Sequence, residues 1–279
     1  MTPSLVPRYA ARTDTGRMRE LNEDYVYAAP ISPANGAGTV LRHLLMVADG
    51  VGGLERGEWA SERAVKVVSA ELPSNLEHMP VDAALRQAAE SANERIWREV
   101  GSSLDPRSGP VATTLVAVVL EERQLWWANV GDSRAYLLGR DHIQQLTRDH
   151  SWTQEQVRNG LLTAEQARLS ERRNWITRGV GYQANVEVDT GGPIAISGDH
   201  LVVLCSDGLH GLVTDPEIAD VARSLEHGAA AERLIALSNE RGGIDNISVV
   251  VCGFAFETIT SADSASSSAR SVWQHTNAT

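Results

Sequence analysis

Six acidic residues are the ones whose types and spacing could perform chemistry, because each lies beside an apolar segment or in a turn between two such segments. They are Glu23, Asp24, Asp49, Asp132, Asp207 and Asp245. Carboxylates gathered at adjoining strand ends are costly to bury unless a cation neutralises them. Oxygen ligands without His or Cys favour Mg²⁺ or Mn²⁺ over Zn²⁺. The pattern indicates a divalent-metal centre, although each Asp–Gly pair taken alone is typical of a turn.

The apolar segments that position these residues predict an α+β fold. Strands are expected over residues 25–28, 41–49, 111–120, 124–130, 133–138, 142–146, 186–189, 200–206 and 246–256. Helices are expected from Glu58 to a stop at Pro73 and over residues 81–100, 215–225 and 229–241. The short links between the central strands favour an antiparallel meander over parallel crossovers. The polar stretch 147–181, with short helices at 153–159 and 163–169, is expected to form a flap-like insertion.

Composition excludes several classes of protein. The 279 residues carry 36 Asp and Glu against 25 Lys and Arg, a net charge of −11, which argues against nucleic-acid binding. The longest apolar run, 115–120, is far shorter than the ~20 residues of a membrane span. The start of the chain lacks the apolar region of a secretory signal. Two cysteines, each closing an apolar run, suit a reducing compartment, and we expect Cys205 to be inert core.

These limits predict a cytoplasmic protein without membrane contact, with monomer as the default state. Residues 1–257 are expected to form one domain. The tail 258–279 is rich in Ser, Thr and Ala, too poor in apolar side chains to offset the entropy of ordering, and is expected to be disordered.

Seven sequence blocks, in their order along residues 12 to 251, resemble the metal-dependent protein phosphatases of the 2C type in their bacterial form. The blocks are TDTGRMRELNED (13–24), VADGVGG (47–53), ATT (112–114), NVGDSRAY (129–136), LTRDHS (146–151), LCSDGL (204–209) and DNISVV (245–250). The resemblance implies a four-layer αββα sandwich, two antiparallel β-sheets flanked by helix pairs. It also implies a serine/threonine protein phosphatase that hydrolyses phosphoserine and phosphothreonine with a metal-activated water, opposing bacterial Ser/Thr kinases.

The resemblance also implies the ligands of two Mn²⁺ or Mg²⁺ ions. Asp49 would bridge the two ions, and the carbonyl of Gly50 would bind the second ion. Asp207 and Asp245 would complete the protein ligands of the first. Metal-activated water needs no cysteine nucleophile.

The remaining acidic residues and one arginine take supporting roles by the same resemblance. Glu23 and Asp24 would act through metal-bound waters. Arg19 would grip the substrate phosphate, since a planar guanidinium binds phosphate oxygens bidentately. Asp132 would be a ligand of a weaker third metal site.

Departures from the family pattern limit this transfer. Val51 stands where some relatives have a His proposed as general acid. His210 follows Asp207 closely and is a tempting substitute, but a structural or solvent-facing role is favoured, since spacing alone cannot orient its ring. Gly211 stands where some relatives have a carboxylate, so a third site would depend on Asp132, Asp207 and waters.

Three arginines of the polar stretch, Arg172, Arg173 and Arg178, could hold phosphoprotein substrates near the cleft. A charged, solvated flap without a role in recognition explains them equally well. Two other functions stay open as well. One is a non-catalytic relative that binds phosphoproteins, which the complete set of acidic residues disfavours. The other is a hydrolase of small phosphate esters.

Overall fold

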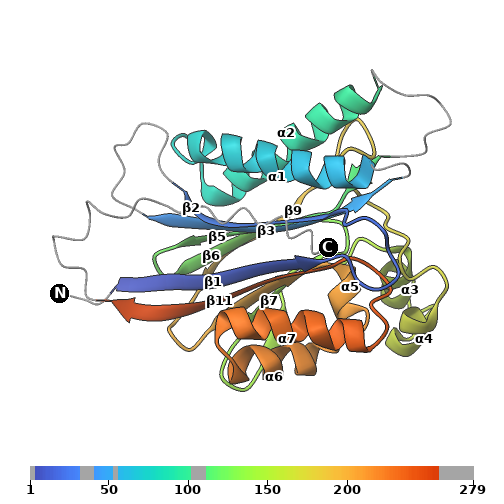
Figure 1. Ribbon diagram of the computed structural model, residues 1–279. Coiled ribbons are helices and arrows are strands. Elements are labelled where there is room, and N and C mark those ends of the chain that lie inside the picture. The colour runs from blue at the N-terminus through green and yellow to red at the C-terminus, as the bar shows by residue number, and fades with distance from the viewer. Residues whose placement is uncertain (1–3, 32–40, 53–55, 102–110, 258–279) are drawn as a thin grey trace.

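The computed structural model describes residues 4–31, 41–52, 56–101 and 111–257, and these form two stacked antiparallel sheets (Figure 1). The first sheet has the order β1-β11-β10-β7-β8: β1 (Ser4–Asp14), β11 (Ile247–Glu257), β10 (Leu201–Cys205), β7 (Arg134–Leu138) and β8 (Ile143–Gln145). The second has the order β2-β3-β5-β6-β9, with β4 paired to β3: β2 (Asp24–Ile31), β3 (Arg42–Val51), β5 (Leu115–Glu121), β6 (Gln124–Val130), β9 (Asp189–Ala195) and β4 (Ala112–Thr113).

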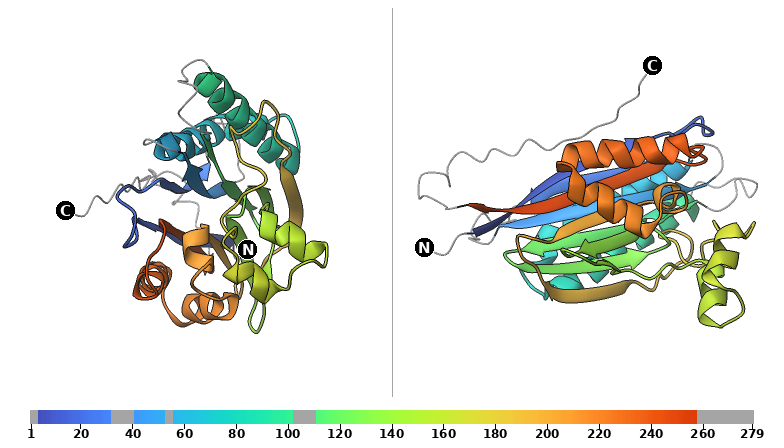
Figure 2. Two further views of the ribbon diagram at one scale, coloured as in Figure 1. Left: turned by 90° about the vertical axis from the view of Figure 1, so that its right-hand side faces the viewer. Right: turned by 90° about the horizontal axis from the view of Figure 1, so that it is seen from below.

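A pair of helices covers the outer face of each sheet. Helices α1 (Arg56–Asn75) and α2 (Val81–Gly101) lie on the second sheet, and α6 (Asp215–Ser224) and α7 (His227–Glu240) lie on the first. Three shorter helices lie near one end of the sheets: α3 (Trp152–Arg158), α4 (Ala164–Leu169) and α5 (Asp207–His210) (Figure 2). The predicted four-layer αββα sandwich is confirmed.

Three apolar clusters fill the spaces between the four layers. One lies between α1, α2 and the second sheet, one between α6, α7 and the first sheet, and one between the two sheets. Strand β3 is central, so its consecutive apolar residues pack against helix on one side and sheet on the other. Cys205 and Cys252 are both buried and free, as expected for inert core residues.

Several predicted boundaries were wrong. Strand β1 was not predicted, and the expected strand at 186–189 lies after that segment instead, as β9. Helix α1 passes Pro73 and ends at Asn75, and the expected strand 111–120 is divided at Thr114. The predicted tail, 258–279, lies outside the described residues.

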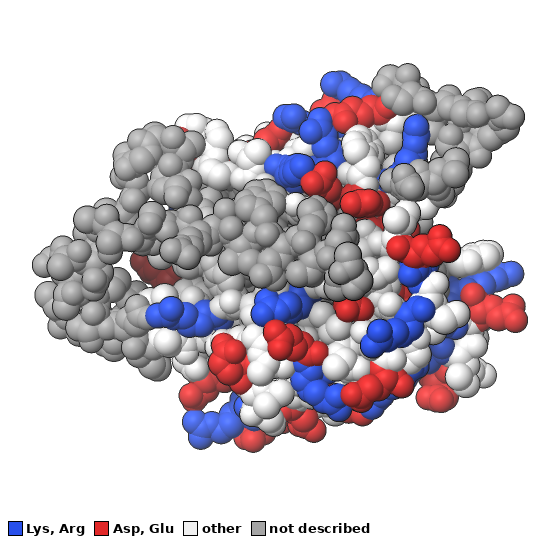
Figure 3. Space-filling model, viewed as in Figure 1, with Lys and Arg blue, Asp and Glu red and all other residues white. Residues whose placement is uncertain are grey.

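Charged side chains of both signs are distributed over the described surface seen in Figure 3. Acidic and basic side chains are interspersed over the face seen in Figure 3, where the described residues show no basic stripe. Within the same residues, none of the helices has both the length and the apolar character to cross a membrane.

Candidate metal centre

Asp24, Asp207, Asp132 and Asp245 all lie close enough to Asp49 to raise its pKa beyond the effect of burial, so these acidic residues meet at one end of the sandwich. Asp24 begins β2 and is in register with Asp49 near the end of β3. Asp207 follows β10, and Asp245 precedes β11, which pairs with β10. Because paired strands are antiparallel, the end of one lies beside the start of the next. Each sheet therefore brings acidic residues to the same place.

Contacts join these residues across the two sheets. Ser206 Oγ in the first sheet donates to Asp24 Oδ2 in the second at 2.8 Å. Asp49 in the second sheet and Asp207 in the first lie close enough for the Asp207 carboxylate to raise the pKa of Asp49 beyond the effect of burial. The site thus lies at the contact between the sheets.

The chemistry of this cluster fits a divalent cation. Burial, together with the neighbouring carboxylates, raises the pKa of Asp24 to about 7 and that of Asp207 to about 6. The same causes raise the pKa of Asp49 and of Asp132 well above the ordinary value. Among the described residues, Asp24 Oδ1 and Asp207 Oδ1 are buried oxygens without a hydrogen-bond partner. A bound cation would satisfy these oxygens and remove the repulsion.

Asp245, one of the clustered carboxylates, is held by an arginine and by a backbone N–H. Arg19 Nη2 pairs with Asp245 Oδ2 at 2.9 Å, and the backbone N–H of Asn246 donates to Asp245 Oδ1 at 2.9 Å. Within the described part of the chain, no three His, Cys, Asp or Glu side chains stand ready as the ligands of one ion. Arg19 already compensates the charge of Asp245, and a cation bound at Asp245 Oδ2 would compete with this contact.

Glu23 and Gly50 hold the end of the second sheet against α1. The N–H of Gly50 donates to the carbonyl of Glu23 at 3.1 Å, and that carbonyl also accepts from Ser61 Oγ at 2.6 Å. Glu23 Oε1 accepts from the N–H of Gly57 at 3.2 Å. A Cβ at Gly50 would lie 2.1 Å from the carbonyl oxygen of Gly57, so only glycine fits there.

A pair of buried hydroxyls connects Asp49 to the turn that carries Asp132. The N–H of Asp49 donates to Thr114 Oγ1 at 2.9 Å, and Thr114 Oγ1 lies 2.7 Å from Ser133 Oγ. The backbone continues the connection, because the N–H of Thr114 donates to the carbonyl of Asp49 at 2.8 Å. Asp49 and the Asp132 turn are thus parts of one hydrogen-bonded unit.

Two histidines fix the same turn from the other side. His150 Nδ1 accepts from the N–H of Gly131 at 3.1 Å. His210 Nε2 donates to the carbonyl of Asp132 at 3.0 Å, because a carbonyl oxygen can only accept. Burial, then Arg134, lowers the pKa of His210 to about 3, so the ring is neutral. These contacts give His210 a structural role, in agreement with the sequence-based preference.

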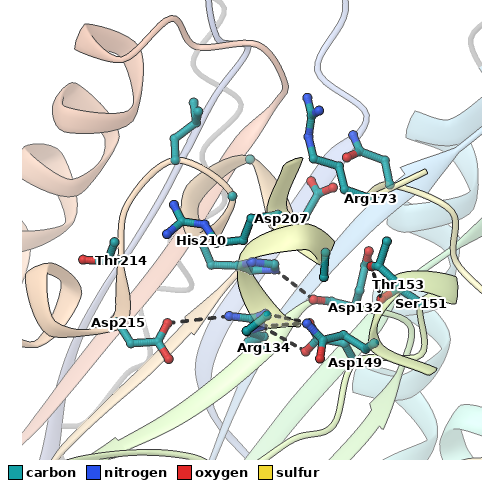
Figure 4. A pocket seen from close by; sticks show the side chains of 18 of the residues that line it. Asp132, Arg134, Asp149, Ser151, Thr153, Arg173, Asp207, His210, Thr214 and Asp215 are labelled. Carbon is teal, nitrogen blue, oxygen red and sulfur yellow. Dashed lines mark hydrogen bonds and ion pairs between the residues drawn. The ribbon is translucent and has the colours of Figure 1, made fainter. Parts of the chain in front are cut away.

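A cavity of about 690 Å³ opens beside the acidic cluster (Figure 4). Asp132, Asp207 and Asp245 line it together with residues of α4 and of the segment after it. In the same cavity Arg134 forms a bidentate pair with Asp149, with Nη2 2.7 Å from Oδ2. This buried pair leaves neither charge uncompensated in the cavity.

The three arginines of the polar stretch have different surroundings. Arg172 lies over the rings of Trp152 and Trp175, at 5.0 and 4.8 Å from their centroids. Arg178 forms ion pairs with two carboxylates, each at 2.8 Å. Arg173 lines the cavity, and Figure 4 shows it beside Asp207. Of the three, Arg173 alone faces the acidic cluster.

Sequence reasoning gave no role to Thr114, Ser133, Arg134, Asp149 and His150, although all five lie within the quoted blocks. They support the site through buried hydrogen bonds and ion pairs. Their position within the family-like blocks was the available sign of a functional role, but their spacing does not indicate which residues they contact.

Comparison with known proteins agrees with this geometry. The family Protein phosphatase 2C matches residues 12–186. A serine/threonine phosphatase stp of Listeria welshimeri is 35% identical over 247 residues, which cover 86% of this chain and 93% of that protein. The serine/threonine protein phosphatase PstP of Mycobacterium tuberculosis is 36% identical over 249 residues, 89% of this chain and 45% of PstP.

Solved structures show the same relationship. The crystal structure of the M. tuberculosis phosphatase PstP superposes with a TM-score of 0.75 and 33% identity, covering 90% of this chain and 99% of that one. The catalytic domain of PstP in complex with two manganese ions superposes with a TM-score of 0.74 and 33% identity, covering 90% of this chain and 100% of that one. The chain therefore belongs to the protein phosphatase 2C family, the metal-dependent serine/threonine protein phosphatases, in its bacterial form.

Proposed function

We propose that this phosphatase holds two Mn²⁺ or Mg²⁺ ions at the contact between its sheets, with Asp49, the Gly50 carbonyl, Asp207 and Asp245 as protein ligands. The observation that carries the proposal is the buried, unpartnered Asp207 Oδ1 in a cluster of carboxylates with raised pKa values. The relative PstP, described with two manganese ions, supports the same number and kind of metal.

Ions bound there lower the pKa of a bound water and so supply hydroxide at neutral pH. Arg19 binds the phosphoryl oxygens in place of its contact with Asp245, and it stabilises their charge during hydrolysis. Asp24 Oδ1 and Glu23 accept hydrogen bonds from water and orient it. His210 is not the general acid, because its Nε2–H is used by the carbonyl of Asp132. Val51 cannot donate a proton, so the leaving oxygen takes its proton from water.

We further propose that Asp132 is a ligand of a third, weaker metal site. Its raised pKa and its place beside Asp207 in the cavity support this role. Gly211, which also lines the cavity, adds no carboxylate, so waters would complete the coordination.

The substrates we propose are phosphoproteins made by a Ser/Thr kinase, and the protein acts as a cytoplasmic monomer. The size of the cavity supports a peptide segment as ligand, because such volumes accommodate molecules much larger than phosphate. Arg173 faces the acidic cluster and is suited to hold an acidic segment, whereas Arg172 and Arg178 are occupied by other contacts.

A matched pair of variants tests the assignment of the metal centre. Asp49→Asn should abolish Mn²⁺-dependent turnover of p-nitrophenyl phosphate and of a phosphothreonine peptide. Asp132→Ala should leave strong Mn²⁺ binding intact by isothermal titration calorimetry. Near-normal activity of Asp49→Asn would refute the assignment.

The same assays separate the alternatives. A wild type that binds Mn²⁺ and phosphopeptide without turnover would be a phosphoprotein-binding module. A kcat/KM much larger for small phosphomonoesters than for phosphopeptides would make it a small-ester hydrolase.

A further inference from the structure

Two large apolar side chains are exposed in the lining of the cavity that contains Asp207 and Asp245. Ile244, next to Asp245 in the sequence, is 39% exposed, and Leu169 at the end of α4 is 76% exposed. Both line the same cavity as Asp207. We call Ile244 and Leu169 the apolar rim.

The loops that carry Met18 and Ile244 are fixed to one another. The N–H groups of Arg17 and Met18 both donate to the carbonyl of Gly243, at 2.7 and 3.2 Å. Gly243 has φ +49°, and a Cβ there would lie 2.9 Å from the backbone nitrogen of Arg17. Because these loops are held by backbone contacts, a ligand that covers the rim does not have to order them.

The cavity is larger than the phosphoryl group that Arg19 and the metal ligands would bind. Its volume of about 690 Å³ lies within the range, roughly 300–1,000 Å³, of sites that enclose drug-sized ligands. Neighbouring residues of a peptide substrate would therefore enter it with the phosphoresidue. The apolar rim would then contact the side chain of the peptide residue adjacent to the phosphoserine or phosphothreonine.

We propose that the apolar rim selects phosphoprotein segments with an apolar side chain next to the phosphoserine or phosphothreonine. The inference rests on the proposed function, because Arg19 and the acidic cluster fix where the phosphate lies. A phosphopeptide fits better than a second copy of the chain or an anionic membrane surface. The reason is that Ile244 and Leu169 line the same cavity as Asp207 and Asp245, the proposed ligands of the metal ions that would bind a phosphoryl group.

The test uses phosphothreonine peptides that differ only in the residue after the phosphothreonine, either Leu or Ala. Wild type, Ile244→Ser and Leu169→Ser are compared, and each kcat/KM is divided by the same variant's p-nitrophenyl phosphate turnover. The control is Leu41→Ser, because Leu41 is 57% exposed beside the start of β3, at the other end of that strand from Asp49.

Wild type and Leu41→Ser should prefer the Leu peptide by about tenfold, mainly through KM, and the two rim variants should lose most of this preference. Equal rates on both peptides with wild type, or an equal loss in Leu41→Ser, would overturn the proposal. A wild-type dimer that Ile244→Ser dissociates, or binding to anionic vesicles that this variant loses, would also overturn it. Wild type without turnover of any substrate in Mn²⁺ would instead refute the proposed function.

Discussion

Removing the hydroxyl of Thr114 tests whether the link between Asp49 and the Asp132 turn matters as the structure indicates. Thr114→Val keeps the shape of the side chain but removes the acceptor of the Asp49 N–H and the partner of Ser133 Oγ. Thr114 is 1% exposed, so water cannot replace the hydroxyl. An unpaired buried polar group costs about 1–3 kcal/mol. The variant leaves the Asp49 N–H unpaired and removes the hydroxyl partner of Ser133 Oγ, so we expect a loss of about 2–3 kcal/mol in the free energy of unfolding.

Metal affinity should fall in the same variant, because the backbone of Asp49, a proposed metal ligand, loses a support. Loss of a group that orients a metal ligand typically lowers metal affinity by about 10–100-fold. Urea unfolding in EDTA measures the stability, and calorimetric titration with Mn²⁺ measures the affinity. Thr114→Ser is the control, since it keeps the hydroxyl and loses only a methyl group. If Thr114→Val matched Thr114→Ser in both measurements, the hydroxyl link would have no role in the site.

Three further changes have outcomes that the structure specifies. Gly208→Ala places a Cβ 1.9 Å from a backbone carbonyl oxygen and should lower Tm by several degrees, whereas Gly228→Ala, facing only a flexible side chain, should be nearly neutral by thermal scanning. In EDTA, the folded state retains protons on Asp24 up to about pH 7 and on Asp207 up to about pH 6, whereas the unfolded chain releases them near pH 4. These two carboxyl groups should therefore lower stability as pH rises from about 4 to 7, whereas His43 and His210, with pKa values lowered by burial to about 4 and about 3, act in the opposite direction with and without metal. The stability gained from saturating Mn²⁺ over EDTA should therefore grow as pH rises from about 5 to 7, and a gain in urea unfolding that stays constant over this range would contradict it. Arg19→Lys keeps the charge but loses the planar fork, and kcat/KM should fall about 10–100-fold in steady-state assays, so an unchanged value would exclude bidentate phosphate binding.

The elements that sequence reasoning missed lie mostly at sheet edges or are very short. Strand β1 contains Pro7 and β9 contains Pro193, and both are edge strands, where proline is tolerated because one row of N–H groups faces away from the sheet. Periodicity therefore under-predicts them. Helix α5 has four residues, so Asp207 and Gly208 could only be interpreted as a turn.

The candidate site could be predicted where the type of residue itself indicates the chemistry. Carboxylates beside strand ends indicated a metal centre, and the structure brings Asp49 and Asp207 from different sheets close enough for Asp207 to raise the pKa of Asp49 beyond the effect of burial. The supporting contacts were not predictable. Thr114 and Ser133 are 19 residues apart, and the sequence does not indicate which group a buried hydroxyl will hydrogen-bond.

The division of the acidic residues between the two sheets has a consequence for folding. Asp24 and Asp49 belong to the second sheet, whereas Asp207 and Asp245 flank strands of the first. Apolar packing between the sheets draws them together, but the same approach brings these carboxylates into mutual repulsion, which the raised pKa values record. Cations that bind both sets replace that repulsion with attraction across the contact between the sheets. Metal binding by the proposed ligands would therefore stabilise the docking of the two sheets, so the free energy of Mn²⁺ binding would add to the free energy of unfolding of the whole domain.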